Sequence, residues 1–413
     1  MSVTTTNHGD TEVGELHVAD LFDQLAGPVQ PRTKEPRPAR SFEPPEFPSW
    51  TGPALRILGF YAIVRGALLL ADSLSARLQY NGELSGPLLS WDAHHYLQVA
   101  ANGYPAVAPR AGGHLTYSNA NFLPVFPFLI RVLEWMGLSS VGAATFVSLV
   151  SGAVAVVLVW RLGTALFDEQ VGRNAAILFA VFPGMAIAWG LFYSECVGLT
   201  LVAGCLLLMV RERWVWAGVV GALATATNPA ALPLELAALV PTIQALRRRK
   251  LPPSLSTLVL VPTGFLAYVV WLAFKYHDTL YWWHLNHQAW DTSVDFGRSL
   301  LGLLPHLWRL GLPGPGWLEW MGVFAVAGAV VALVRARAPG MINAYCIGVL
   351  VLLFVSDTSG FRPRLLTWAF PALIAVAAVT RRRGWQPIAI AFACLLPITF
   401  VVYTTLGNTM GAP

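Results

Sequence analysis

Apolar runs of about 20 residues recur along the chain after residue 50 and alternate with short polar segments. A run of this length lets one α-helix cross the hydrocarbon core of a bilayer. Hydrophobic residues form 55% of the sequence and charged residues 12%, which is typical of a polytopic membrane protein. The pattern predicts an all-α transmembrane helical bundle with about 11 spans, at residues 54–72, 141–163, 174–192, 195–210, 214–228, 230–246, 255–274, 318–334, 341–356, 364–380 and 386–404.

The N-terminal segment, residues 1–50, has a different composition. It contains no apolar signal-peptide core, and prolines crowd its second half. Such a segment cannot build a packed core. We expect a disordered cytoplasmic tail, either a dispensable solvated extension or a docking segment for a partner enzyme. Residues 51–413 are expected to form one transmembrane domain.

Basic residues gather in short segments between the predicted spans. With a cytoplasmic N-terminus these segments all fall on the cytoplasmic side, in agreement with the positive-inside rule. This bias accounts for the net charge of +5, so no nucleic-acid partner is needed. Arg far outnumbers Lys, which favours a GC-rich bacterial origin and a plasma-membrane location. The clusters are Arg211/Arg213, Arg247 to Lys250, Arg335/Arg337 and Arg381 to Arg383.

Two long outer loops are expected, at 73–140 and 275–317. Within the first, apolar positions in 92–101 recur at helical spacing, which favours a short amphipathic helix parallel to the membrane. The segment 121–137 is apolar enough to resemble a span, but Pro124, Pro127, Arg131 and Glu134 interrupt it. It is predicted to be an interfacial helix on the outer surface.

The second outer loop contains an aromatic run from Tyr281 to Trp290. Trp and Tyr collect at membrane interfaces, so this run can be an anchor. It can also be a wall that binds a sugar or lipid, and then Trp283 and His287 are candidate binding residues. His284 and His287 could form a metal site with His277 and Asp278, but this spacing is unspecific, and we expect no metal.

The polar segment Trp91-Asp92-Ala93-His94-His95-Tyr96 lies after the first span and before Asn102-Gly103-Tyr104. A carboxylate at the mouth of a membrane bundle is costly to keep, so it is expected to have a function. Asp92 is therefore the candidate catalytic residue.

This segment, with Asn119 to Pro127 behind it, resembles the first luminal loop of the PIG-V mannosyltransferases of GPI-anchor assembly. That family shows Trp-Asp, a Gly-Tyr and then a Phe-Phe-Pro-x-x-Pro element. Phe182-Pro183 with Tyr193-Ser194-Glu195 is similar to the family's Ser-Pro and Tyr-Ser-Glu. Ala224 to Pro229 is similar to its Arg-Ser-Asn-Gly turn, but the Arg is missing here. The matches cover roughly residues 55–235, in the family's order.

The resemblance implies a GT-C glycosyltransferase fold and a polyprenyl-phosphate-mannose donor used on the extracytoplasmic side. It also implies that Asp92 is the general base. The chemistry agrees, because an acceptor hydroxyl that displaces a prenyl phosphate must lose its proton, and a nearby carboxylate can take it. A single displacement inverts the anomeric centre. The acceptor would be a glycolipid, a polysaccharide or a protein.

The leaving phosphate needs a cation. Arg362 and Arg364 lie at the outer end of a span, where positive-inside bias does not place them. They are predicted to bind the donor phosphate; the alternative is a pair of snorkelling arginines neutralised by Asp357. No cofactor is expected, and a divalent metal is less needed because the donor carries one phosphate.

Five further residues are candidates for substrate binding. His94 and His95 either orient Asp92, contact substrate, or are merely interfacial polar residues. Glu195 either holds an arginine or the acceptor, or belongs to a helix cap that begins at Ser194. Trp91 and Tyr193 complete the set through their places in the two motifs.

A transporter or lipid flippase is the competing class, since polytopic composition fits it equally well. Transporters usually keep ionisable residues or broken helices near the membrane midplane. In this sequence the charges are predicted at helix ends and in one system of outer loops, which favours the enzyme.

Overall fold

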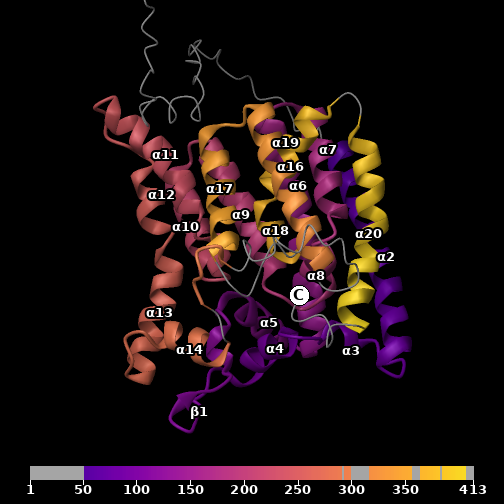
Figure 1. Cartoon of the computed structure of the whole chain (residues 1–413), viewed down its shortest axis with the longest axis vertical. Helices are drawn as coiled ribbons and strands as arrows, with labels where there is room; N and C mark the ends of the chain where they lie inside the picture. The colour runs from indigo at the N-terminus through magenta and orange to yellow at the C-terminus, as the bar shows by residue number, and fades with distance from the viewer. Residues whose placement is uncertain (1–50, 291–292, 299–315, 356–362, 382–383, 406–413) are drawn as a thin grey trace, which may run out of the picture.

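In the computed structural model, the described residues are 51–290, 293–298, 316–355, 363–381 and 384–405. The predicted tail at 1–50, together with Asp357 and Arg362, lies outside them. The long helices run side by side along one direction, and short helices lie across their lower end (Figure 1). The helices of this bundle are α2 (Thr51–Gln79), α6 (Ser140–Leu166), α7 (Glu169–Val181), α9 (Glu195–Val210), α10 (Trp214–Thr225), α11 (Leu234–Arg247), α12 (Leu255–Leu260), α13 (Thr263–Tyr276), α16 (Gly316–Ala336), α17 (Gly340–Val355), α19 (Pro371–Val379) and α20 (Trp385–Thr405).

The all-α prediction is confirmed, and helices occupy every predicted span. Among the described residues, five helical segments are long and apolar enough to cross a membrane, including α2, α6 and α20. Large apolar side chains remain exposed on their outer faces, among them Ile63 on α2, Phe146 on α6 and Ile390 on α20. Surfaces of this kind suit a lipid environment, and the protein is an integral membrane protein.

Some predicted spans are broken, contrary to the sequence analysis. The span at 174–192 is two helices, α7 and α8 (Met185–Gly190), because Phe182 precedes Pro183 and adopts an extended conformation with ψ 130°. The span at 364–380 is divided into α18 (Pro363–Leu366), η3 (Thr367–Ala369) and α19, which begins at Pro371. A turn at Val261 and Pro262 separates α12 from α13, but both residues keep helical backbone angles, so residues 255–276 still form one candidate span. The short helix η2 (Pro229–Ala231) precedes α11.

The first outer loop contains the expected surface helices, α4 (Ala93–Asn102) and α5 (Val125–Trp135), which contact each other and α6. It also holds α3 (Ser85–Leu88), η1 (Asn119–Asn121) and a hairpin of β1 (Arg110–Ala111) and β2 (His114–Leu115), paired antiparallel with Arg110 opposite Leu115. The hairpin projects at the bottom of Figure 1.

The two outer loops pack together through a small apolar core separate from that of the bundle. It joins Leu115 and Leu123 of the first loop to Tyr268 of α13 and to Leu285 of α14 (Tyr281–Ala289). Tyr268 Oη donates to the carbonyl of Ala120 at 2.9 Å. The α14 segment is thereby held against the loop that carries Asp92.

Candidate active site

Asp92 occupies the turn that leads into α4. Its backbone N–H donates to Tyr193 Oη at 3.1 Å. An Asp at this position usually accepts a hydrogen bond from the first turn of its helix. Here Asp92 has φ −73° and ψ −10°, and its side chain makes no capping bond. The carboxylate is therefore not used to stabilise α4.

Glu195 and Arg364 form an ion pair beside this turn. Arg364 Nε lies 3.4 Å from Glu195 Oε1, and Glu195 is 2% exposed. The guanidinium carbon is 5.0 Å from the ring centroid of Tyr193, which fits a cation–π contact. Arg364 also interacts electrostatically with Asp92. The pairing contradicts the interpretation of Arg364 as a snorkelling residue.

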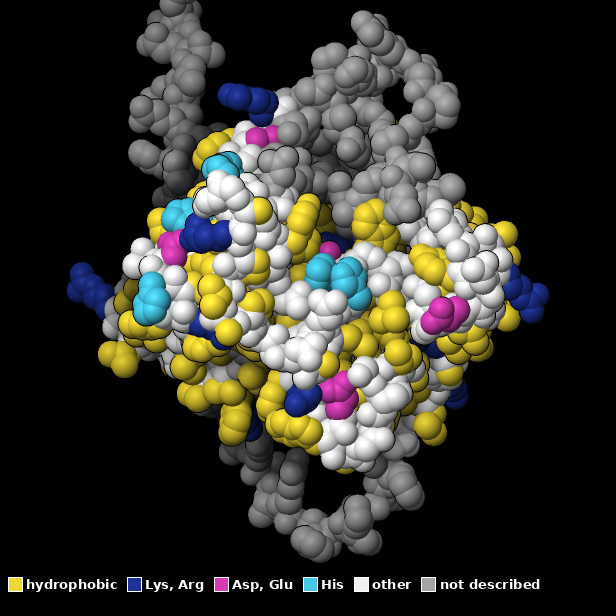
Figure 2. Space-filling model, turned by 90° about the horizontal axis from the view of Figure 1, so that it is seen from below, with side chains coloured by type: hydrophobic (Ala, Val, Ile, Leu, Met, Phe, Trp, Pro, Cys, Tyr) yellow, Lys and Arg dark blue, Asp and Glu magenta, His cyan; other side chains and the backbone are white. Residues whose placement is uncertain are grey.

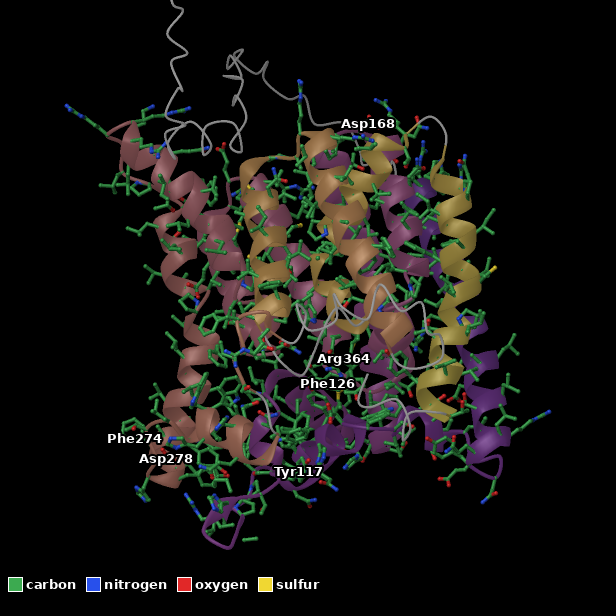
Figure 3. All side chains as sticks on the ribbon, in the orientation of Figure 1. Tyr117, Phe126, Asp168, Phe274, Asp278 and Arg364 are labelled. Atoms are coloured by element: carbon green, nitrogen blue, oxygen red, sulfur yellow. The ribbon has the colours of Figure 1, made fainter. Side chains whose placement is uncertain are left out.

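Figure 3 labels Arg364 in the lower half of the bundle, above the short helices. Seen from below, the molecule has His side chains beside a hollow in which acidic and basic atoms are visible (Figure 2). Arg364 lies on the bundle side of these short helices, and its partner Glu195 is buried.

Ser194 links the three sequence elements that carry the family resemblance. Its Oγ lies 2.9 Å from Tyr96 Oη of α4 and accepts a hydrogen bond from Asn228 Nδ2 at 3.3 Å. Ser194 does precede α9, but its side chain makes no capping bond. Ser194 thus takes the N-cap position of α9 that one alternative predicted, but its hydroxyl is used between helices.

His95 is held inside the outer loop. Its Nδ1 lies 2.7 Å from Asn119 Oδ1, and its ring stacks on Phe122 at 4.9 Å between centroids. Burial, reinforced by the neighbouring His94, lowers the pKa of His95 below its usual 6.5. Since Asn119 Nδ2 donates to Gln98 Oε1, we assign Nδ1 of His95 as the donor to Asn119 Oδ1. His94 is exposed, 3.9 Å from the His95 ring.

The aromatic run of the second loop reaches the site through Trp290, which the sequence analysis did not select. The Trp290 ring lies 6.0 Å from the His95 ring and 5.5 Å from that of Phe122. Trp283, 52% exposed, and His287 instead share the exposed face of α14, one turn apart. No feature of the sequence separates Trp290 from the other aromatic residues of the run.

A metal site at the histidines of α14 is not formed by the described residues, which contain no group of three His, Cys, Asp or Glu placed to hold an ion. His284 Nδ1 is hydrogen-bonded to Asp278 Oδ2 at 2.8 Å instead. Burial raises the pKa of Asp278, but the bond to His284, the bond from the Leu280 N–H and the nearby charges of His284 and Arg110 together lower it below its usual range.

Trp91 and Arg65 have roles that their sequence positions did not reveal. Trp91 Nε1 donates to the carbonyl of Tyr403 in α20 at 3.2 Å. Arg65, within the apolar α2, donates to the carbonyl of Trp189 in the last turn of α8. A cation at a helix carboxyl end is favourable, and here it stabilises the short helix that precedes Tyr193. A single Arg inside an apolar run is the signal that could have found it.

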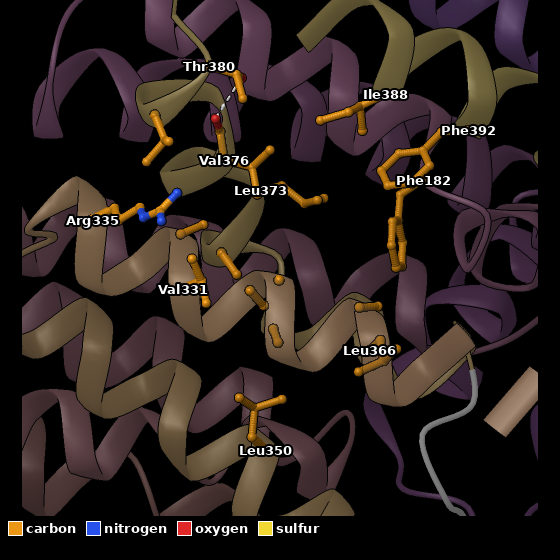
Figure 4. A pocket seen from close by; sticks show the side chains of 17 residues that line it. Phe182, Val331, Arg335, Leu350, Leu366, Leu373, Val376, Thr380, Ile388 and Phe392 are labelled. Carbon is orange, nitrogen blue, oxygen red and sulfur yellow. Dashed lines mark hydrogen bonds between the residues drawn. The ribbon is translucent and has the colours of Figure 1, made fainter. Parts of the chain in front are cut away.

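An apolar cleft of about 350 Å³ opens between α16, α17, α19 and α20 (Figure 4). Small residues such as Ala329 and Ala372 line it, and Arg335 stands toward one end. Its wall includes Leu366, two residues after Arg364. The cleft therefore adjoins the segment that carries the buried cation.

The fold is similar to that of two solved structures of ArnT from Cupriavidus metallidurans. The form bound to undecaprenyl phosphate aligns with a TM-score of 0.54 at 15% identity, over 86% of this chain and 78% of that chain. The apo form gives 0.53 and 14%, over 87% and 78%. An Archaeoglobus fulgidus oligosaccharyltransferase tethered with an acceptor peptide gives 0.44 and 13%, over 88% and 56%.

No protein-family model and no curated protein sequence matches the chain. The structural likeness establishes the fold, a GT-C-like transmembrane bundle. At this level of identity it says nothing of the reaction, which has to be argued from the site.

Proposed function

We propose that the protein is a GT-C glycosyltransferase that moves a sugar from a polyprenyl-phosphate donor to an acceptor on the extracytoplasmic side. The main support for the proposal is the position of Asp92 beside the Arg364–Glu195 pair. The Asp92 carboxylate makes no capping bond to its helix and is therefore available for chemistry. A base and a cation next to each other are what a displacement at a sugar phosphate needs. Mannose is proposed as the sugar from the sequence resemblance alone.

In this mechanism the acceptor oxygen attacks the anomeric carbon while Asp92 takes the hydroxyl proton. The bond between that carbon and the phosphate oxygen breaks on the opposite face, so a β-linked donor gives an α-linked product. The departing polyprenyl phosphate gains negative charge, which Arg364 stabilises. Glu195 and Tyr193 hold the guanidinium in place through the ion pair and the ring contact. The donor carries one phosphate, and we propose that Arg364 takes the place of a divalent cation.

A lipid-linked donor has further support. The apolar cleft continues from Leu366, close to Arg364 in the chain, so a prenyl chain could lie in it while its phosphate meets the arginine. The structurally similar ArnT was crystallised with undecaprenyl phosphate. A donor of the polyprenyl-phosphate class therefore suits both the fold and the position of the cation.

Two observations favour a transporter or lipid flippase. Arg65 lies inside the membrane span of α2, and the break between α7 and α8 is of the kind found in transporters. Arg65 is engaged by the Trp189 carbonyl, however, and so has a structural role. Scrambling of a fluorescent prenyl phosphate in proteoliposomes would favour transport if it occurred without any sugar transfer.

The test uses membranes that contain the full-length protein, incubated with radiolabelled polyprenyl-phosphate-mannose. We expect label to move to a lipid, polymer or protein fraction, and membranes with Asp92→Asn to show little transfer. Equal label in both membranes, or none in any fraction although folded protein is present, would overturn the proposal. Polyprenyl-phosphate-glucose in parallel tests the sugar separately from the reaction type.

A further inference from the structure

Trp91, the residue before Asp92, has a backbone conformation that large side chains rarely adopt. Its φ is +60°, in the left-handed region that favours glycine. A non-glycine residue stays there only when its surroundings hold it, and such residues cluster at functional sites. The contacts of Trp91 and Ser90 show what holds Trp91 in this conformation.

The carboxyl end of α20 supplies the contacts. The last four carbonyls of a helix have no partner within it. Trp91 Nε1 donates to one of them, Tyr403 O, at 3.2 Å, and Tyr80 Oη donates to the next, Thr404 O, at 3.1 Å. Tyr80 Oη is also 2.7 Å from Ser90 Oγ. Both residues before Asp92 are thus tied to the end of one helix.

A second contact fixes Asp92 from the other side, where its N–H meets Tyr193 Oη. The turn is held between α20 and the segment before α9. Because the backbone of Asp92 is helical and its carboxylate makes no capping bond, the angle of the preceding residue sets where that carboxylate points. A change of about 1 Å at a reacting group is enough to cost roughly 100-fold in rate.

We propose that Trp91 is a positioning residue, held in its left-handed conformation by the carboxyl end of α20 so that the Asp92 carboxylate faces the acceptor hydroxyl. This inference rests on the proposed function, with Asp92 as the base. It assigns the indole N–H to the protein rather than to substrate, which differs from the role the sequence suggested. The carboxyl end of α20 thereby becomes part of the catalytic apparatus through its contacts with Trp91 and Tyr80.

The test is Trp91→Phe in the full-length protein, which removes the N–H donor and keeps an aromatic ring. We expect kcat to fall roughly 10-fold or more while KM for the donor stays within about twofold. Trp216→Phe, at a 65% exposed position on α10, is the matched control and should leave both constants unchanged. Unfolding temperatures of the variants are measured alongside.

A double variant separates positioning from substrate contact. In an Asp92→Asn background, Trp91→Phe should cost almost nothing further, because residues that act as one unit are not additive. A raised KM with unchanged kcat, or full additivity, would overturn the proposal. If Trp91→Phe does not fold, Tyr80→Phe, which loses the bond to Thr404, carries the same expectation. Absence of transfer by the wild type would instead count against the proposed function itself.

Discussion

Arg364 and Glu195 come from separate helices and meet with 3.4 Å between Nε and Oε1. This contact is an ion pair and not a hydrogen bond. In the described part of the chain, Arg364 Nε and Glu195 Oε2 are therefore buried atoms without a hydrogen-bond partner. Buried polar atoms normally have partners, and exceptions call for an explanation. A ligand whose oxygens and hydroxyls complete these bonds is the explanation we adopt.

Arg364→Ala tests the cation. If the guanidinium neutralises the leaving phosphate, its loss should remove roughly 2–4 kcal/mol of transition-state stabilisation, seen as a lower kcat/KM for the donor. Arg110→Ala, on the exposed hairpin, is the matched control and should behave as wild type. Unchanged kinetics in Arg364→Ala would leave the ion pair as a structural feature only.

Glu195→Ala tests the pair as a stabilising element. Removing one partner leaves the other charge poorly compensated, so the free energy of unfolding should fall by about 3–5 kcal/mol in detergent solution. The double variant Glu195→Ala with Arg364→Ala should be more stable than Glu195→Ala alone, because the unpaired cation is gone. A double variant no more stable than the single one would contradict this reading of the pair.

His95 should make stability depend on pH. Its pKa in the folded protein is below the usual 6.5 because of burial and the adjacent His94. As pH falls from about 6.5 toward that lower pKa, the unfolded chain takes up the proton first, so stability decreases. The unfolding temperature of the wild type should therefore drop more between pH 7.5 and 5.5 than that of His95→Gln. Equal drops would show that His95 titrates normally in the fold.

Sidedness is tested with introduced cysteines. Leu84 is 55% exposed and Leu251 is 93% exposed, so both regions can react if the reagent reaches them. We expect cysteines near residues 85 and 290 to react with an impermeant thiol reagent from outside intact cells, and one near residue 249 not to react. Labelling at 249, or none at 85, would reverse the proposed orientation.

The sequence alone predicted the helices well, because apolar runs and breakers act locally. Ser140–Leu166 and Glu195–Val210 lie within a few residues of the predicted 141–163 and 195–210. The break at Phe182 could have been predicted, since the residue before a proline avoids the helical conformation. The length of the apolar run instead predicts one continuous span at 174–192.

The site was harder to predict because its geometry is tertiary. Asp92 and Arg364 follow from the motif and from charge at a span end. Glu195 does hold an arginine, as one alternative predicted, but nothing local identifies that arginine as Arg364. The sequence does not single out Trp290, because the aromatic and polar residues beside it are equally good candidates for an interfacial anchor or a binding wall. Only its packing on Phe122 and His95 distinguishes it. The left-handed Trp91 has no sequence signal at all, since its partner is a backbone carbonyl of α20.

Asp92→Asn tests the centre of the proposal. The amide keeps the size and polarity of the side chain but cannot accept the acceptor's proton, so transfer should fall roughly 100-fold or more. Folding and donor binding should survive, because the structure uses the Asp92 backbone N–H, and not its carboxylate, in the bond to Tyr193. Transfer rate, unfolding temperature and donor affinity of purified protein are the three measurements.

Two further variants at this turn sharpen the outcome. Asp92→Glu should keep only partial activity, because the added methylene displaces the carboxylate from the attacking oxygen. His94→Ala removes an exposed imidazole and should have a milder effect. If well-folded Asp92→Asn transfers sugar at the wild-type rate, Asp92 is not the base. His95 would then be the next residue to test, because it lies in the same turn of α4, interacts with Asp92, and has a pKa lowered by burial.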